Sequence, residues 1–517
     1  MLKPNVLAVL LIMFISTLGS PVHMLEAAEQ PLDQSISTTN THLRFTYEDV
    51  QLPANEKMGF LGSTMLFDVN DWLSTGIGAY GAVAGKRGGF ITLGGAVEVR
   101  RELAPWLELN SGLFVGAGGG RGGFQLSGGG LMLRYHLGAK LKSERWGSLG
   151  AGVSHVDFPD GTIHSSQPYL SYEYPFKTVI SSGWFDSDRL DGYGGVYSPE
   201  AEHEFAVVSR TYRIPSGVKQ DNGIRAQHPI IHLLGVEWSR YLDKNLFVRI
   251  ESEGAMGGES TGYMQILFGG GYRFSLLDSS WLKLTSSAGV AGGGAVATGG
   301  GFLIDATAAL QQQLGDHLFA EVAVGYVVAP GGDFKAVSYA GKLGYHFYSP
   351  DFTDESSPVS SLEGFEPLNL RIRTAHQSYY RASPQWRSHH ANLNVDLLGF
   401  QVDYFMNETL FLTGQGLAAY KGKAGAYMTG LLGAGVHLPI FGSPVYAEAE
   451  LLGGAAGGGG LAVGGGLVWQ ASAGLGYQFS DVYSAQLSYG HMSAAKGSFR
   501  AKTLTFAVGY KFSLFLK

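Results

Sequence analysis

The amino-acid sequence predicts an all-β chain that forms a transmembrane antiparallel β-barrel from three eight-stranded repeats. Three observations support this class. Glycine triplets and closing aromatic residues recur at matching intervals, apolar and polar residues alternate along segments longer than ordinary soluble strands, and glycine accounts for 77 of 517 residues. A fixed internal period indicates a repeated supersecondary unit, so the repeat defines the architecture before residue propensities are considered.

The two recurring markers delimit the units. The glycine triplets are Gly128, Gly129 and Gly130, then Gly299, Gly300 and Gly301, then Gly464, Gly465 and Gly466. The closing aromatics are Phe176, Phe347 and Phe512, and they keep the same intervals as the triplets. We therefore expect β repeats at 42–176, 204–347 and 368–517, with linkers at 177–203 and 348–367.

The chain begins with the features of a secretory signal. Lys3 supplies a basic start, Val6–Leu18 is a short apolar run, and Ala27 with Ala28 offers small residues for cleavage. We expect a signal peptide at 1–28, a short tail at 29–41 and Sec-type export. The chain has no cysteine, which excludes disulfides and thiolate metal sites.

The middle repeat shows its strands most clearly. The expected strands are Phe205–Pro215, Pro229–Leu242, Leu246–Gly257, Gly262–Leu277, Trp281–Gly294, Phe302–Leu314, Leu318–Pro330 and Phe334–Pro350. Several connections are short runs of Asp, Asn, Gly and Ser, such as Asp243-Lys244-Asn245, which is hairpin chemistry. Neighbouring strands should therefore be antiparallel.

The strands should cross a membrane. They are close to the roughly 9–11 residues that a transmembrane strand needs, and aromatic residues gather near their ends. A spanning sheet must close, because lipid cannot satisfy an open edge. We favour one barrel of about 24 strands, and the alternative is three tandem eight-stranded barrels. A second alternative makes the uncharged stretch Leu451–Tyr477 a transmembrane helix, although its glycines are poor helix formers.

The last strand resembles the closing strand of bacterial outer-membrane β-barrels as a class. Gly509, Phe512 and Leu514 follow the glycine-then-alternating pattern of such strands, whereas the final residue, Lys517, departs from the usual aromatic. The resemblance implies an outer-membrane location, contact with outer-membrane lipid, and insertion by the barrel-assembly machinery.

The last hairpin also resembles that of the lipid A deacylases, whose His-x-Ser-Asn supplies base and nucleophile. Here His491 and Ser493 match, and Ala494 replaces the Asn. Residues two apart on a strand face the same side, as a Ser–His pair requires. The pair is absent from the equivalent positions of the other repeats, so catalysis at His491 and Ser493 remains an alternative and no enzymatic activity is favoured.

The favoured function is an outer-membrane channel or export pore for a hydrophilic solute or polymer, and the other alternative is a structural or adhesive protein. A wide lumen would accept the charged residues that alternation places on the inward face: Arg44, Glu48, Arg249, Glu251, Glu321, Arg371, Arg373 and Lys511. An export pore would add a periplasmic partner. The net charge of −7 favours no nucleic-acid partner, and no cofactor or metal is expected. The glycine-rich hairpins near 116–130, 291–301 and 454–466 would lie on one rim, where they narrow the mouth or dock a partner.

Overall fold

The structure is a computed structural model of the chain. It describes residues 36–143, 147–185, 200–351, 362, 364–440 and 442–517. The predicted signal peptide lies outside these residues, as does part of each predicted linker. The described residues contain 24 strands, and every strand pairing is antiparallel.

The strands fall into three groups of eight. Barrel 1 contains β1 (Ile36–Gln51), β2 (Lys57–Asn70), β3 (Leu73–Ala84), β4 (Ile91–Ala104), β5 (Leu107–Gly119), β6 (Leu131–Ser143), β7 (Gly147–Asp157) and β8 (His164–Ser182), with a 3-10 turn η2 (Pro53–Asn55) and a short helix α2 (Gly123–Ser127) in its loops. Barrel 2 contains β9 (Glu200–Arg213), β10 (Ile230–Tyr241), β11 (Leu246–Gly257), β12 (Met264–Leu277), β13 (Ser280–Gly292), β14 (Phe302–Gln313), β15 (Leu318–Val328) and β16 (Lys335–Pro350). Barrel 3 contains β17 (Glu366–Arg381), β18 (Val395–Phe405), β19 (Leu410–Lys421), β20 (Met428–Pro439), β21 (Val445–Gly457), β22 (Leu467–Gln478), β23 (Tyr483–Ala494) and β24 (Arg500–Leu516).

Each group closes on itself, so the expectation of one 24-stranded barrel is wrong. The eighth strand pairs with the first strand of its own repeat: Tyr172 with Phe45 in barrel 1, Leu343 with Val207 in barrel 2 and Phe506 with His376 in barrel 3. The alternative of three tandem barrels describes the structure. β8 and β16 are each separated from the next strand by more residues than a hairpin turn has, so neither strand is held against the next repeat.

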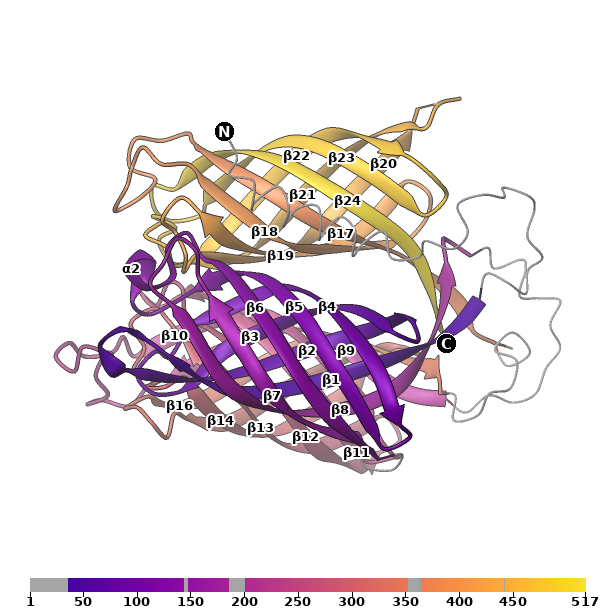
Figure 1. Cartoon of the computed structure of the whole chain (residues 1–517), viewed down its shortest axis with the longest axis horizontal. Helices are drawn as coiled ribbons and strands as arrows, with labels where there is room; N and C mark the ends of the chain where they lie inside the picture. The colour runs from indigo at the N-terminus through magenta and orange to yellow at the C-terminus, as the bar shows by residue number, and fades with distance from the viewer. Residues whose placement is uncertain (1–35, 144–146, 186–199, 352–361, 363, 441) are drawn as a thin grey trace.

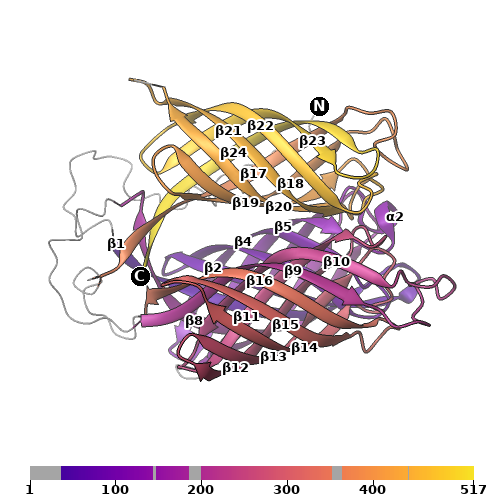
Figure 2. The same cartoon turned by 180° about the vertical axis from the view of Figure 1, so that it is seen from behind.

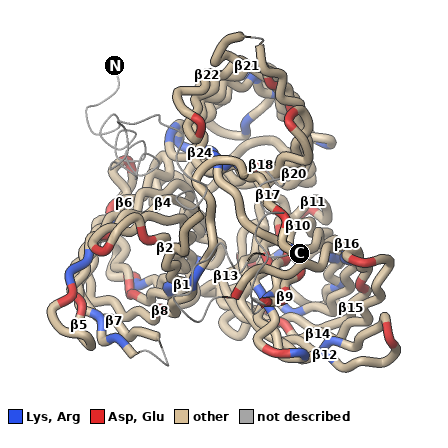
Figure 3. Tube along the Cα trace, turned by 90° about the vertical axis from the view of Figure 1, so that its right-hand side faces the viewer, with Lys and Arg blue, Asp and Glu red and all other residues tan. Residues whose placement is uncertain are grey.

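The three barrels stand side by side, with β17–β24 above the other two in Figure 1 and the reverse side shown in Figure 2. Figure 3 looks along the barrels and shows three separate rings. The longer loops, such as the one carrying α2, lie at one end, here named the loop end. The hairpin turns lie at the opposite end, here named the turn end, together with the last residues of β8 and β16 and the first residues of β9 and β17.

Strands extend into both predicted linkers. β8 continues to Ser182 and β9 begins at Glu200, while β16 continues to Pro350 and β17 begins at Glu366. At the turn end these extensions join the barrels: Phe512 of β24 pairs with Ser182 of β8. The stretch Leu451–Tyr477 forms parts of β21 and β22 with the loop between them, not a helix.

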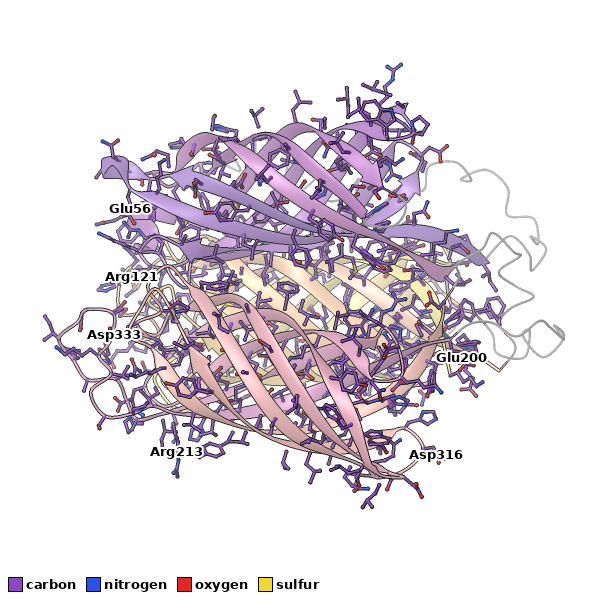
Figure 4. The ribbon with its side chains drawn as sticks, turned by 90° about the horizontal axis from the view of Figure 1, so that it is seen from below. Glu56, Arg121, Glu200, Arg213, Asp316 and Asp333 are labelled. Atoms are coloured by element: carbon purple, nitrogen blue, oxygen red, sulfur yellow. The ribbon has the colours of Figure 1, made fainter. Side chains whose placement is uncertain are left out.

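The outer surface of each barrel carries an apolar band. In barrel 1, Leu137, Leu149, Val153 and Leu170 are exposed by 60%, 65%, 61% and 65%. Side chains project outward along the strands in Figure 4, which places Arg121 at the loop end and Asp316 at the turn end. So much exposed aliphatic surface on neighbouring strands is unfavourable in water and favourable in lipid.

Exposed aromatic side chains border this band at both ends. Trp72 and Trp106 lie in turns at the turn end, and Tyr135, Tyr326 and Tyr489 lie on the loop-end halves of their strands. Two aromatic borders are typical of a barrel that meets two membrane–water interfaces. Separately, no helix in the described residues is long and apolar enough to span a bilayer.

Candidate functional site

The interior of barrel 3 holds a buried layer of ion pairs, here called its charge layer. The Arg371 guanidinium lies 2.8 Å from both the Asp403 and the Glu448 carboxylates. Arg373 lies 2.7 Å from Asp403 and 2.6 Å from Glu450. Alternation along β17, β18 and β21 turns all five side chains inward, where they are shielded from solvent.

Barrel 2 has a larger charge layer. Arg210 lies 2.9 Å from both Glu251 and Glu253, and Arg249 lies 3.0 Å from Glu237. The layer continues through Lys283, Glu204, Asp305, Lys342 and Glu321. Each cation faces more than one carboxylate, so the network is shared between strands and not divided into isolated pairs.

Barrel 1 repeats the arrangement. Arg44 contacts the carboxylates of Glu98 and Glu173, and Lys140 lies 3.2 Å from Glu98 and 3.1 Å from Glu173. Closer to the loop end, a separate pair joins Arg134 to Glu48 at 2.8 Å. The three barrels therefore share one internal design with different residues.

A layer of packed apolar side chains fills each barrel on the loop-end side of its charge layer. In barrel 3 the layer includes Tyr379, Trp386, Tyr427 and Phe499, all fully buried. The equivalent layer of barrel 2 includes Tyr212, Tyr263 and Phe334. The equivalent layer of barrel 1 includes Phe60, Tyr80, Phe90, Phe114 and Phe158. An eight-stranded barrel is only wide enough for its own side chains, and here they occupy it.

The predicted lumen residues lie as follows. Arg44, Glu48, Arg249, Glu251, Glu321, Arg371 and Arg373 are buried in the barrel interiors as ion-paired groups. Lys511 lies at the turn end of β24, where its ammonium is 4.1 Å from the centre of the Trp184 ring. These charges face one another across narrow barrels. The described strands close into three narrow barrels and enclose no wide lumen around these charges.

Sequence reasoning missed the larger part of each charge layer. The missed members are Glu98, Glu108 (which lies 2.9 Å from Lys140), Arg134, Lys140, Glu173, Glu204, Arg210, Glu237, Glu253, Lys283, Asp305, Lys342, Asp403, Glu448 and Glu450. Their signal was present, because each is an inward position of an alternating strand. Glu448 and Glu450, for example, alternate with Ala449 and Leu451. Reading every strand for inward charges would have shown that each repeat carries its own carboxylates and cations.

His491 and Ser493 point away from the barrel interior, near the loop end of β23. The Ser493 hydroxyl lies 2.9 Å from His491 Nε2. Among the described residues, no carboxylate pairs with His491. Other His–hydroxyl contacts occur on the described strands, among them His155 with Ser166 at 2.8 Å, His232 with Thr211 at 3.0 Å and His376 with Ser378 at 3.2 Å. The pair is therefore well formed and is not unique to the last hairpin.

The glycine-rich hairpins lie at the loop end, where they contact neighbouring barrels. The β3–β4 loop of barrel 1 meets the β13–β14 loop of barrel 2, with the Gly88 N–H donating to Gly299 O at 2.9 Å. The β11–β12 loop of barrel 2 meets the β21–β22 loop of barrel 3, where the Thr261 hydroxyl donates to Gly464 O. The β19–β20 loop of barrel 3 meets the β5–β6 loop of barrel 1, with the Ser127 hydroxyl donating to Gly425 O at 3.2 Å.

In all three contacts, the loop after the third strand of one barrel meets the loop after the fifth strand of the next barrel. Glycines, which have no side chain, allow the two backbones to approach this closely. A Cβ added at Gly89, Gly119 or Gly457 would overlap the backbone of a neighbouring barrel. The triplet glycines Gly128, Gly129, Gly130, Gly299, Gly300, Gly301, Gly464, Gly465 and Gly466 lie in the same loops. The described residues contain no group of three or more His, Asp or Glu side chains placed to hold a metal ion.

Comparison with known proteins gives fold-level likeness only. No protein-family model and no curated protein sequence matches the chain. Among solved structures, the chain is similar to the siderophore receptor PirA from Acinetobacter baumannii, at 9% identity and a TM-score of 0.26 over 92% of this chain and 80% of that chain. It is also similar to OpdQ from Pseudomonas aeruginosa, at 12% identity and a TM-score of 0.20 over 92% and 98% of the two chains.

TM-scores this low carry no argument about function, which depends on the barrels themselves.

Proposed function

We propose that the protein is an integral outer-membrane scaffold, a single-chain trimer of sealed barrels that acts through its lipid-facing surface and its ends. The observation that carries this proposal is the filled interior. Each barrel holds both a charge layer and a packed apolar layer. The apolar band with aromatic borders supports membrane placement, and a closed antiparallel barrel suits the outer membrane.

Solute transport, which the sequence favours, is the competing proposal. Passage along a barrel would require the aromatic side chains at the loop end to move and the guanidinium–carboxylate pairs to separate. A polymer would need far more room than an eight-stranded wall encloses. A periplasmic export partner belongs to this competing proposal.

Conductance separates the two proposals. The full chain, reconstituted into planar bilayers, is expected to give no discrete current steps. Current steps that change in size in Arg371→Gln, but stay the same in the exposed control Lys142→Gln, would overturn the sealed scaffold in favour of a gated lumen. A scaffold further predicts that cells lacking the protein become more permeable to detergents, and that the native gene restores the barrier.

Lipid-ester hydrolysis is a second candidate because of one observation. The Ser493–His491 hydrogen bond of 2.9 Å lies on the outer side of β23, where His491 is half-buried and Ser493 is buried. The structure supplies no orienting acid for His491 among the described residues, which weakens a triad mechanism. Fatty-acid release from lipid A that is lost in His491→Ala and Ser493→Ala, and kept in His155→Ala, would establish this activity. Equal release from all four proteins would remove it.

A further inference from the structure

A cavity of about 300 Å³ lies where the three barrels meet. Leu93 reaches it from barrel 1, Leu234 and Met264 from barrel 2, and Met428 and Leu432 from barrel 3. The cavity is therefore outside all three lumens and on the outer, lipid-facing sides of the barrel walls. Its volume is at the lower end of the range for small-molecule binding sites.

The walls of this central cavity are mostly apolar. Glu253 and Gln415 contribute only backbone, because their side chains point into their own barrels, where they bond to Arg210 and Gln401. Ser252, which alternates with two inward glutamates on β11, supplies a hydroxyl. An apolar cavity of this kind is a poor site for ordered water.

Glycine has a different role here from the one it has in the loop contacts. A Cβ at Gly457 would overlap Gly262 of the neighbouring barrel, so that glycine permits close approach. A Cβ at Gly430 would meet no atom within 4 Å, and one at Gly416 would first meet Leu93 at 4.0 Å. Close packing therefore does not require glycine at Gly430 and Gly416. Their missing side chains leave space that no other part of the described chain fills.

The cavity has a closed end and an accessible side. Gly89, Gly119, Gly262 and Ala426 line it from the loop-end connections, and these loops hold the barrels together there. Leu432, 36% exposed, and the exposed Gly430 connect it to the outer surface of barrel 3. The apolar wall thus continues into the apolar band, and the loop end leaves no room for a polar headgroup.

We propose that this central cavity holds the methyl end of one acyl chain of a phospholipid from the turn-side leaflet. The chain enters tail first from the lipid around the barrels and ends beneath the glycine loops. Its headgroup stays at the turn-end interface. The burial of methylene groups against Leu, Met and Ala side chains drives the binding, at about 0.8 kcal/mol per CH₂. The inference rests on the membrane placement proposed above and not on the scaffold role.

Gly430→Leu tests the proposal, because Gly430 lines the cavity and a Cβ there meets no atom within 4 Å. Gly341→Leu is the matched control: its Cβ also meets no atom within 4 Å, but it lies on the exposed outer face of β16. After purification in mild detergent, native protein and Gly341→Leu should retain on the order of one phospholipid per chain, a single site's content. Gly430→Leu should retain several-fold less. Equal retention in both variants would overturn the proposal.

A second measurement needs no variant. A phospholipid with a photoreactive diazirine near its acyl terminus is incorporated into vesicles with the native protein, and the cross-linked peptides are identified by mass spectrometry. Adducts on 428–432 are expected. Adducts found only on residues of the outer apolar band would overturn the proposal. It would also be overturned if a lipopolysaccharide probe, and not the phospholipid probe, labelled 428–432. Vesicle flotation in the same experiment checks membrane insertion separately.

Discussion

Removing Arg371 should destabilise barrel 3 strongly, because it leaves two buried carboxylates short of a partner. Arg371 lies 2.8 Å from both Asp403 and Glu448, and all three side chains are fully shielded from solvent. Breaking a buried ion pair by removing one partner costs about 3–5 kcal/mol. With a urea slope of about 2 kcal/mol per M, Arg371→Met should lower the unfolding midpoint by about 2 M.

The matched control is the exposed pair between Lys142 and Glu102. Their distance of 2.7 Å is as short as those of the Arg371 pairs, but the two side chains are 37% and 53% exposed. An exposed pair contributes about 0–1 kcal/mol, so Lys142→Met should shift the midpoint by less than about 0.5 M. The assay is urea unfolding in detergent micelles, followed by circular dichroism at a single wavelength.

Two results decide the reasoning. Equal midpoints for Arg371→Met and Lys142→Met would mean that water solvates the Arg371 site, and the sealed interior would be refuted. The double variant Arg371→Met with Glu448→Met should recover part of the loss, since one fewer carboxylate is left unpaired. Its failure to recover would show that packing around Arg371, which lies over the Phe405 and Phe411 rings, matters more than charge.

Three further predictions concern the seams and the turns. In this cysteine-free chain, Gly254→Cys with Ala455→Cys should form a disulfide between barrels 2 and 3, because a Cβ at Gly254 lies 3.1 Å from that of Ala455. Mass spectrometry should detect the disulfide as a linked peptide, and the control pair Gly341→Cys with Ala455→Cys should give none. Gly457→Leu should separate the same two barrels and abolish the 254–455 link, whereas Gly315→Leu, with open space around it, should leave the link intact. Backbone N–H groups of Leu246 and Asn245 lower the pKa of the Asp243 carboxyl, so the ionised form stabilises this turn. This stabilisation of the turn is complete above the ordinary Asp pKa of about 4 and is lost as pH falls through the lowered pKa. Hydrogen exchange at the Leu246 amide should become faster over that pH range. Asp243→Asn should remove this pH dependence.

The strands and their order could be predicted from the sequence, whereas barrel closure could not. β11 spans Leu246–Gly257 as expected, because alternation and the Asp243 turn mark its limits. Closure depends on whether the eighth strand of a repeat pairs with the first strand of its own repeat or with the first strand of the next one. The alternation of apolar and polar residues is the same in both cases. The long connections at 177–203 and 348–367 were the useful signal, since an antiparallel hairpin needs only two to five residues.

The site was partly predictable for the same reason. Inward charge on β1, β11 and β17 follows from alternation, so Arg44, Arg249 and Arg371 could be placed on the inner wall from the sequence. Their partners could not be assigned from the sequence. Glu173, Glu237 and Glu448 lie on other strands, and how close those strands come to the arginines depends on how the barrel wall curves and closes. The contacts of the glycine loops were also beyond the sequence, since they join repeats that no local pattern relates.

The seam between barrel 1 and barrel 3 constrains how this molecule is assembled. It joins the β5–β6 hairpin to the β19–β20 hairpin, where Ser127 bonds to Gly425 and Val115 packs with Tyr420. The two hairpins belong to the first and last thirds of the polypeptide, so this interface forms only after the β19–β20 hairpin has been synthesised. A chain that ends before this hairpin leaves Val115 and Ala117 without their packing partners in barrel 3.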